Sequence, residues 1–454
     1  MFPQNLTNGI KSALPEIVWP PIVGDQAASL LAMLFYIEQS QWWSAERIIS
    51  SQLEQGRVLL RHAKKTTSYY SEHLSGFDLR QPLDMTSWLK VPLLTRNALQ
   101  AAEDTIISSQ LPQSHGSIFT TQTSGSTGQN VVVRSTTLTQ HFWNVLTIRE
   151  HLWHKRSFEG THAIIRVLEN VPAGGQLNPE WGSPFNLIWR TGNSAIMNLL
   201  TDVHIQADWL RRVNPRYLLT YPSNLSALLE LFESRGERLP ALAQVRTIGE
   251  TLTPDIRENC QRVLGVPIVD IYSSQEVGYI ALQCPDNDCY HIQAENLLVE
   301  ILHENGMPCS PGETGQVVVT SLHNFAAPLI RYVIGDYAEV AETCSCGRGL
   351  PAIRRILGRR RNLITLPNGK RFWPIFGHMK FRKIAPVRQY QVIQTAIDRL
   401  DVRLVVEVPL IIEQEQLLRN VICEAIGYQM EICFVYMDSI PIVAGKHEEF
   451  RSEI

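Results

Sequence analysis

A loop rich in hydroxyl side chains and glycine follows a β-like run at residues 117–121. It consists of Thr123, Ser124, Gly125, Ser126, Thr127 and Gly128. The glycines permit positive φ angles and a close backbone approach, and the hydroxyl groups add donors, so the loop can form a concave nest for phosphate oxygens. No GxxxxGK[ST] pattern occurs there, so this is not a Walker A loop. From these residues alone, an ordinary flexible Ser/Gly loop is the other interpretation.

The cysteines suggest a metal site in the C-terminal half of the chain, where all eight of them lie. Cys284 and His291 are followed, some fifty residues later, by the C-x-C pair Cys344 and Cys346. Three thiolates and one imidazole suit a closed tetrahedral Zn²⁺ site, with Cys289 as a substitute ligand from the same loop. The alternative is a set of buried free thiols with a nearby loop histidine.

Further short segments follow the hydroxyl-rich loop in a fixed order: Gly249-Glu250, YSSQE at 272–276, RYVIGD at 331–336, Gly358-Arg359 and Gly445-Lys446. Together they resemble the adenylate-forming superfamily, specifically its phenylacetate-CoA ligase-like branch, which includes coenzyme F390 synthetase-like and capsular-polysaccharide-associated members. The resemblance runs from about residue 118 to the end of the sequence. Because several weak motifs occur in the expected order, chance agreement is far rarer than for any single motif.

The resemblance implies a nucleotide site built from these segments. The loop at 123–128 would bind the β- and γ-phosphates of ATP, and Gly249-Glu250 would lie on the adenine side. Tyr272 matches the aromatic residue that packs beside adenine, and Glu276 matches the carboxylate that holds Mg²⁺. Asp336 matches the aspartate that accepts hydrogen bonds from the ribose hydroxyls. These roles suit the side chains, because Mg²⁺ prefers hard carboxylate oxygens and an ionised aspartate is a good acceptor.

The same resemblance assigns a mobile C-terminal part. Lys446 resembles the superfamily's adenylation lysine, whose ammonium would bridge the acid's carboxylate and the ATP α-phosphate as charge develops. The segment GRRRN at 358–362 aligns with the family's hinge motif G-R-x-D-D, with Arg359 as its arginine. Arg361 therefore stands where the pivotal aspartate usually lies, and we expect the rotation of the small domain to be altered.

Two other departures from the family pattern concern the pocket. Ser273 and Gln275 stand where the family's Y-G-x-[ST]-E motif has Gly and Ser or Thr, which predicts a reshaped floor near the acyl adenylate. Gln129 and Asn130 stand where many relatives have Lys and Pro just after the phosphate loop. The missing lysine is common in this branch.

The acid-binding residues are less well defined by the sequence. Tyr221, Pro222 and Ser223 match the family's P-S segment beside the acyl site, and Ser274 belongs to the same predicted pocket. By general location, further candidates are Trp181, Trp189 and Tyr279. Aromatic side chains in an α/β core are more often packing residues than substrate contacts.

The pattern of elements predicts an α/β fold. Residues 26–65 show helical spacing of apolar side chains, and short β-rich runs alternate with helix-like segments from about residue 117. This alternation is typical of layers built on largely parallel strands. After residue 295 the pattern becomes hairpin-like, with Asn305-Gly306 as a turn, which predicts an antiparallel or barrel-like subregion. From 362 onward the order strand, strand, helix, strand predicts a small α+β domain.

We therefore expect two domains. Residues 1–357 would form a large N-terminal domain that binds ATP and acid, 358–361 a hinge, and 362–454 a small mobile C-terminal domain. The net charge of −3 gives no basic excess for a nucleic-acid partner. No run approaches the 18 to 20 apolar residues of a membrane span, and the first residues do not resemble a secretory signal, so we expect a soluble, cytoplasmic protein. Analogy with relatives suggests a homodimer.

The predicted activity is that of an AMP-forming ligase for a small-molecule carboxylic acid. An aryl or arylacetic acid would react with ATP and Mg²⁺ to give an acyl adenylate and pyrophosphate, and the resemblance suggests coenzyme A as the thiol that displaces AMP. One alternative is an adenylating enzyme that delivers the acyl group to an amine or to a carrier protein. Another is a non-catalytic nucleotide-binding regulatory protein that has kept the fold.

Overall fold

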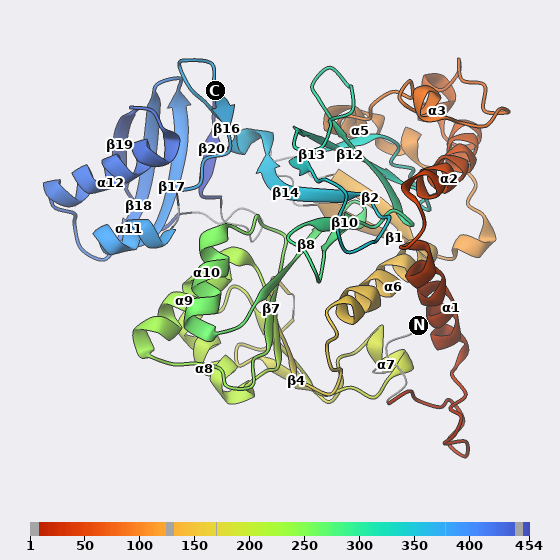
Figure 1. Cartoon of the computed structure of the whole chain (residues 1–454), viewed down its shortest axis with the longest axis horizontal. Coiled ribbons are helices and arrows are strands. Elements are labelled where there is room, and N and C mark those ends of the chain that lie inside the picture. The colour runs from red at the N-terminus through yellow and green to blue at the C-terminus, as the bar shows by residue number, and fades with distance from the viewer. Residues whose placement is uncertain (1–8, 124–130, 169, 377, 441–447) are drawn as a thin grey trace.

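A computed structural model of the chain describes residues 9–123, 131–168, 170–376, 378–440 and 448–454. Its largest element is a twelve-stranded sheet with the strand order β11-β12-β13-β14-β10-β9-β8-β7-β6-β3-β5-β4. Helices cover both faces of the part built from β3 to β8, and a separate small sheet near the C-terminus lies to one side (Figure 1). The structure thus has the mixed α/β architecture that the sequence predicts.

The N-terminal region is helical, and its helices pack against the large sheet. The predicted helix at 26–65 is interrupted at 41–44, where Ser44 begins a second helix by accepting a hydrogen bond from the backbone N–H of Arg47 at 3.3 Å. The elements are α1 (Asp25–Ser40), α2 (Ala45–Thr66), α3 (Ser68–His73), α4 (Met85–Trp88), α5 (Arg96–Ala102) and the 3₁₀ turns η2 (Glu103–Ile106) and η3 (Gln113–His115).

The predicted parallel strands form one half of the large sheet. Neighbouring strands in the order β5-β3-β6-β7-β8 are parallel, and β4 is an antiparallel edge strand. Alternate residues enter two different cores, as along β3, where Ala163 and Ile165 pack with α8 to α10 while Ile164 packs with α6. The elements are β3 (His162–Arg166), β4 (Gln176–Asn178), α7 (Phe185–Ile188), β5 (Ser194–Asn198), α8 (Val203–Val213), β6 (Tyr217–Thr220), α9 (Pro222–Arg235), β7 (Gln244–Ile248), α10 (Pro254–Leu264) and β8 (Ile268–Ser274).

The antiparallel strands continue the same sheet. The predicted hairpin around Asn305-Gly306 is present as β11 and β12, and within the described residues β11 is an edge strand, so the subregion is an extension of the sheet and no closed barrel. Two early runs that we expected among the sheet strands instead pair with each other as the antiparallel hairpin of β1 and β2. The elements are β1 (Ile118–Thr123), β2 (Val131–Thr136), α6 (Thr137–Trp153), β9 (Gly278–Gln283), β10 (Tyr290–Ile292), β11 (Leu297–Leu302), β12 (Thr314–Ser321), β13 (Tyr332–Val340) and β14 (Ala352–Arg359).

The C-terminal segment has its own sheet and its own hydrophobic core. A four-stranded sheet with the order β19-β18-β17-β20 packs with α11 and α12, and its buried side chains all lie between Ile364 and Phe450. Its elements are η4 (Arg360–Asn362), β15 (Ile364–Thr365), β16 (Arg371–Phe372), α11 (His378–Ile384), β17 (Val387–Ala396), β18 (Arg399–Val406), α12 (Ile412–Ile426), β19 (Glu431–Tyr436) and β20 (Phe450–Ser452). Among the helices that the structure describes, none has the length and apolar character needed to cross a bilayer.

Candidate active site

The predicted nucleotide and acid segments meet at one edge of the sheet. Strands β6, β7 and β8 are parallel neighbours, so their carboxyl ends lie side by side. Tyr221-Pro222-Ser223 follows β6, Gly249-Glu250 follows β7, and Ser274 ends β8 two residues before Glu276. In open α/β sheets this edge is where ligands bind, because loops from several strands converge there.

Glu250 links two of these segments. Its carboxylate accepts hydrogen bonds from the Ser223 backbone N–H at 2.9 Å and from the Ser223 hydroxyl at 3.0 Å. Ser223 is the second residue of α9, so Glu250 satisfies a donor at the helix N-terminus that has no partner within the helix. Gly249, with a φ of 84°, makes the turn that brings Glu250 there.

Tyr272 and Asp336 form the centre of the predicted nucleotide site. The Tyr272 hydroxyl donates to Asp336 Oδ2 at 2.8 Å, and Arg359 Nε lies 3.6 Å from Asp336 Oδ1. Burial, together with the Asp336 charge, raises the pKa of Tyr272 well above its ordinary value, so the hydroxyl stays protonated and donates. Asp336 is paired with Arg359 in the register of β13 and β14, which explains why residues from two motifs face the same carboxylate.

Glu276 lies beside an arginine that no motif indicated. Arg96 Nη1 is 4.0 Å from Glu276 Oε1, and the two side chains are 22% and 10% exposed. Tyr332 borders both, and burial raises its pKa to about 12, with the Glu276 charge adding to the rise and Arg96 opposing it. Glu276 is thus a shielded carboxylate at the mouth of the site, a fitting ligand for a divalent cation.

Several predicted residues lie outside the described residues: Ser124, Gly125, Ser126, Thr127 and Gly128 of the loop, and Lys446. Thr123 is the last residue of β1, and it is paired in register with Val131, the first residue of β2. Thr123 and Val131, which flank residues 124–130, therefore lie directly opposite each other. The roles assigned to this loop and to Lys446 stay predictions.

The aromatic candidates for the acid pocket differ in their surroundings. Trp189 is fully buried and Trp181 nearly so, and both pack in a core with Phe158 and Phe185, which is a structural role. Tyr279 is buried in the same core, and it stacks on the partly buried Trp143 of α6 with ring centroids 4.2 Å apart, three residues beyond Glu276.

The serine and tyrosine of the predicted pocket lie at the sheet edge. The Ser274 hydroxyl accepts from the Val277 N–H at 3.3 Å, which shapes the turn that carries Glu276. Tyr221 is buried and precedes α9 as its N-cap residue.

The cysteine and histidine side chains converge on one point between two loops. Cys284 Sγ and Cys289 Sγ lie 3.8 and 3.6 Å from Cys344 Sγ, and Cys346 Sγ lies 3.3 Å from His291 Nε2. Four donors, from Cys284, Cys289, His291 and Cys344, fall within 4.8 Å of one another. For a tetrahedral ion with Zn–S bonds of about 2.3 Å, neighbouring sulfurs would be about 3.8 Å apart, so the spacing fits zinc.

The protonation of this cluster follows from its burial. Burial raises the pKa of Cys284 to about 11 and lowers the pKa of His291 to about 4, so these two groups are neutral near pH 7. His291 Nδ1 lies 3.3 Å from the Leu350 carbonyl oxygen, which orients Nε2 toward the thiols. All eight cysteines are free of disulfide bonds.

The hinge segment contacts the strand that follows the predicted lysine. Arg361 forms an ion pair with Glu448, and Asn362 donates to the Phe450 carbonyl oxygen. The Trp373 indole N–H also donates to the carbonyl oxygen of Arg359 at 3.0 Å. A further ion pair, between Arg382 of α11 and Glu230 of α9, joins the C-terminal segment to the large sheet's helices.

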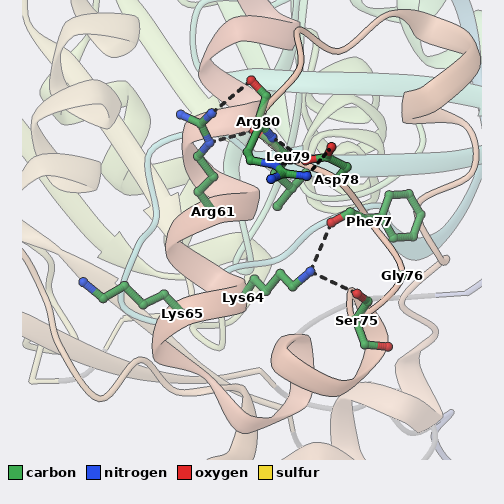
Figure 2. A pocket seen from close by; sticks show the side chains of 9 residues that line it. All are labelled: Arg61, Lys64, Lys65, Ser75, Gly76, Phe77, Asp78, Leu79 and Arg80. Carbon is green, nitrogen blue, oxygen red and sulfur yellow. Dashed lines mark hydrogen bonds and ion pairs between the residues drawn. The ribbon is translucent and has the colours of Figure 1, made fainter.

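A pocket of about 560 Å³ elsewhere in the molecule is rich in cations but serves a structural purpose (Figure 2). It lies between α2 and the loop 75–80. Arg61 Nε donates to the Leu79 carbonyl at 2.8 Å, and Lys64 Nζ donates to the carbonyls of Ser75 and Phe77 at 3.2 and 3.1 Å. These cations hold the loop on the helix.

Comparisons with known proteins agree with this geometry, although no family model matches the sequence. A stretch of 159 residues is 30% identical to phenylacetate-coenzyme A ligase of Thermus thermophilus, covering 34% of this chain and 36% of that protein. A stretch of 259 residues is 27% identical to phenylacetate-coenzyme A ligase of Escherichia coli, covering 53% and 59%. Protein CapK of Staphylococcus aureus is 18% identical over 344 residues, covering 73% and 72%. The matched regions thus span about a third and three fifths of the two ligases.

Solved structures share the fold across most of the chain. A crystal structure of 2-hydroxyisobutyryl-CoA ligase in the postadenylation state, in complex with 2-HIB-AMP, has a TM-score of 0.69 at 16% identity and covers 88% of this chain and 89% of that one. The same ligase in the thioesterification state gives a TM-score of 0.57 over 90% of each chain. The chain thus shares the fold of this CoA ligase over most of its length. In sequence, parts of it are similar to phenylacetate-coenzyme A ligases.

Sequence reasoning did not find two residues of this region. Arg96 lies in a segment without a motif. It lies close to Glu276 because its segment contacts β13, a strand that is distant in the sequence. Trp143 lies in a helix whose spacing indicates only packing. Cys289 was named as a substitute ligand, and the structure places its sulfur within the compact donor set.

Proposed function

We propose that this protein is an ATP-dependent acid–coenzyme A ligase that acts on an aryl or arylacetic carboxylate. The observation that carries the proposal is the Tyr272–Asp336 hydrogen bond beside Glu276. It joins motif residues 64 positions apart into one site at the carboxyl edge of the sheet. Two of the three relatives named above are phenylacetate-coenzyme A ligases, which supports the same activity here.

In the first half-reaction, an oxygen of the acid attacks the ATP α-phosphorus. The bond to the β-phosphate oxygen breaks, and pyrophosphate leaves with the electron pair. Asp336 would accept hydrogen bonds from the ribose, Tyr272 would border the adenine, and Glu276 would bind Mg²⁺, which neutralises phosphate charge. The loop 123–128 and Lys446 would stabilise the charge that develops on the phosphates and the acid.

In the second half-reaction, the sulfur of coenzyme A attacks the acyl carbonyl carbon, and AMP leaves. We propose that residues 362–454 rotate about 358–361 relative to 1–357 between the two steps, with Arg359 at the pivot. A separate hydrophobic core between Ile364 and Phe450 supports this division, because it lets the small unit move without being unpacked. The acid would bind near Tyr221, Pro222, Ser223 and Ser274, against the stacked pair of Tyr279 and Trp143.

We propose further that a structural Zn²⁺ ties the loops at 284–291 and 344–346 together. Cys284, His291 and Cys344 would be ligands, and the fourth would be Cys346 or Cys289. When bound, zinc supplies a closed cross-link between the loops and takes no part in the reaction. Cys284 follows the end of β9, and His291 lies in β10.

Pyrophosphate release tests the proposed activity. Purified protein is incubated with MgATP and a panel of aryl, arylacetic and aliphatic acids, each with and without coenzyme A. We expect pyrophosphate with aryl or arylacetic acids, and AMP and acyl-CoA in equal amounts when coenzyme A is present. Pyrophosphate that does not respond to coenzyme A would instead assign an amine or a carrier protein as acceptor. ATP binding without pyrophosphate from any acid would favour the regulatory alternative.

A further inference from the structure

Arg96 is fixed in the site by contacts with the strand that carries Asp336. Leu94 forms a parallel bridge with Tyr332, its N–H donates to the Arg331 carbonyl at 3.0 Å, and its carbonyl accepts from the Val333 N–H at 2.9 Å. The next residue, Thr95, begins α5 by accepting from the Ala98 N–H at 3.1 Å. The backbone on which Arg96 stands is therefore held by β13, and the guanidinium points toward Glu276.

The same region contains Val131, the first residue of β2. Val131, the first described residue after the hydroxyl-rich loop, is buried in one hydrophobic cluster with Leu94, Leu99 and Tyr332. The segment that carries Arg96 therefore packs near the end of the β1–β2 hairpin at which Thr123 and Val131 pair.

The phosphates of ATP carry negative charge, which Arg96 can neutralise. MgATP brings a triphosphate, and residues 123–130 contain no lysine or arginine of their own. A guanidinium suits this task because it stays charged and can donate two parallel hydrogen bonds to a phosphate. Arg96 is 22% exposed, so it is shielded from bulk water and still reachable by a ligand.

We propose that Arg96 is a catalytic residue that binds the β- and γ-phosphates of ATP, and that it exchanges Glu276 for phosphate when MgATP enters. The proposal rests on the proposed function. As the acid's oxygen bonds to the α-phosphorus, negative charge grows on the leaving pyrophosphate, and Arg96 stabilises it. Glu276 would hold Mg²⁺ at the same time, so neither charged group would lose a partner.

The test is equilibrium binding of ATP, pyrophosphate and AMP, each with Mg²⁺, to Arg96→Gln and Arg96→Lys. Hydrogen bonds to charged groups contribute about 1.5–3 kcal/mol, which corresponds to about 10- to 100-fold in affinity. We expect Arg96→Gln to weaken ATP and pyrophosphate binding by that factor and to leave AMP binding within about twofold. Arg96→Lys should fall between, because it keeps the charge and loses the bidentate geometry.

Arg80→Gln is the matched control, because Arg80 also faces a single carboxylate, Asp78, but on the exposed loop of Figure 2. It should bind all three ligands like the wild type. Thioester formation from a supplied acyl adenylate should be unchanged in every variant, since that step involves no pyrophosphate. If the glutamine variant does not fold, the lysine variant carries the same comparison of ATP with AMP.

Two results would overturn the proposal: equal losses for ATP and AMP, which mark a structural role, or unchanged pyrophosphate binding. A wild-type chain that binds neither ATP nor pyrophosphate overturns it together with the proposed function. A wild-type chain that binds MgATP but releases no pyrophosphate with any acid overturns the proposed reaction alone, because the binding comparison at Arg96 does not depend on turnover.

Discussion

The ion pair between Arg361 and Glu448 should control the adenylation step. Arg361 lies in the proposed hinge, and Glu448 lies two residues after Lys446. Glu448 also accepts from the Gln391 side chain through its carbonyl at 3.1 Å, so it anchors the strand that follows the lysine segment. Breaking the pair should misplace Lys446 while leaving the rest of the site intact.

The size of the effect follows from the burial of the pair. Arg361 and Glu448 side chains are 29% and 20% exposed. Exposed pairs contribute about 0.2–1 kcal/mol, while breaking a buried pair costs about 3–5 kcal/mol. A pair between these limits should cost about 2 kcal/mol, or about 30-fold in rate if the loss falls on the adenylation transition state.

The assay is ATP–pyrophosphate exchange, compared with thioester formation from a supplied acyl adenylate. Arg361→Glu and Glu448→Arg should each slow exchange about 30-fold, and the double variant with the charges swapped should recover most of the loss. Thioester formation should change less, because the proposed rotation would withdraw Lys446 from the site in that step. The reasoning is refuted if the swap restores nothing, or if both half-reactions slow equally. Arg399→Glu, which breaks the Arg399–Asp401 pair within the small unit, is the control.

Three further predictions concern binding, metal content and pH. Tyr272→Phe removes the donor to Asp336 and should weaken ATP binding by about tenfold, measured by calorimetry, with the melting temperature little changed. The purified protein should contain about one zinc per chain by elemental analysis. Whichever of Cys289→Ser and Cys346→Ser lowers the zinc content identifies the fourth ligand. If both variants contained as much zinc as the wild type, the proposed ligand set would be wrong. Burial lowers the pKa of His154 to about 4. Below pH 6.5 the unfolded chain therefore binds a proton that the native state does not, and stability should fall by about 3 kcal/mol between pH 6.5 and 4. In urea unfolding, the free energy of unfolding of His154→Gln should fall less than that of the wild type over the same pH range. An identical fall would show that His154 is not the cause.

The motif residues could be predicted from the sequence because each stands at a place where the local pattern is restrictive. Glycine and hydroxyl residues after a β-like run, acidic residues after strand-like segments and Asn305-Gly306 between apolar runs each reflect a local backbone or charge requirement. Their common order along the chain then indicated the superfamily and, with it, the α/β fold. The hairpin of β11 and β12 and the strand, strand, helix, strand order near the C-terminus followed from periodicity alone.

Contacts between distant segments were decided by the tertiary structure. The sequences of β1 and β2 resemble strands of the large sheet. In the structure, however, the two strands pair with each other as an antiparallel hairpin. Arg96 reaches Glu276 because Leu94 bridges to Tyr332, a contact across more than 230 positions that no local pattern encodes. Likewise, whether Cys289 or Cys346 lies nearer the other thiols depends on how two loops pack. A sequence records which chemistry each residue can perform, while the packing of strands decides which residues perform it together.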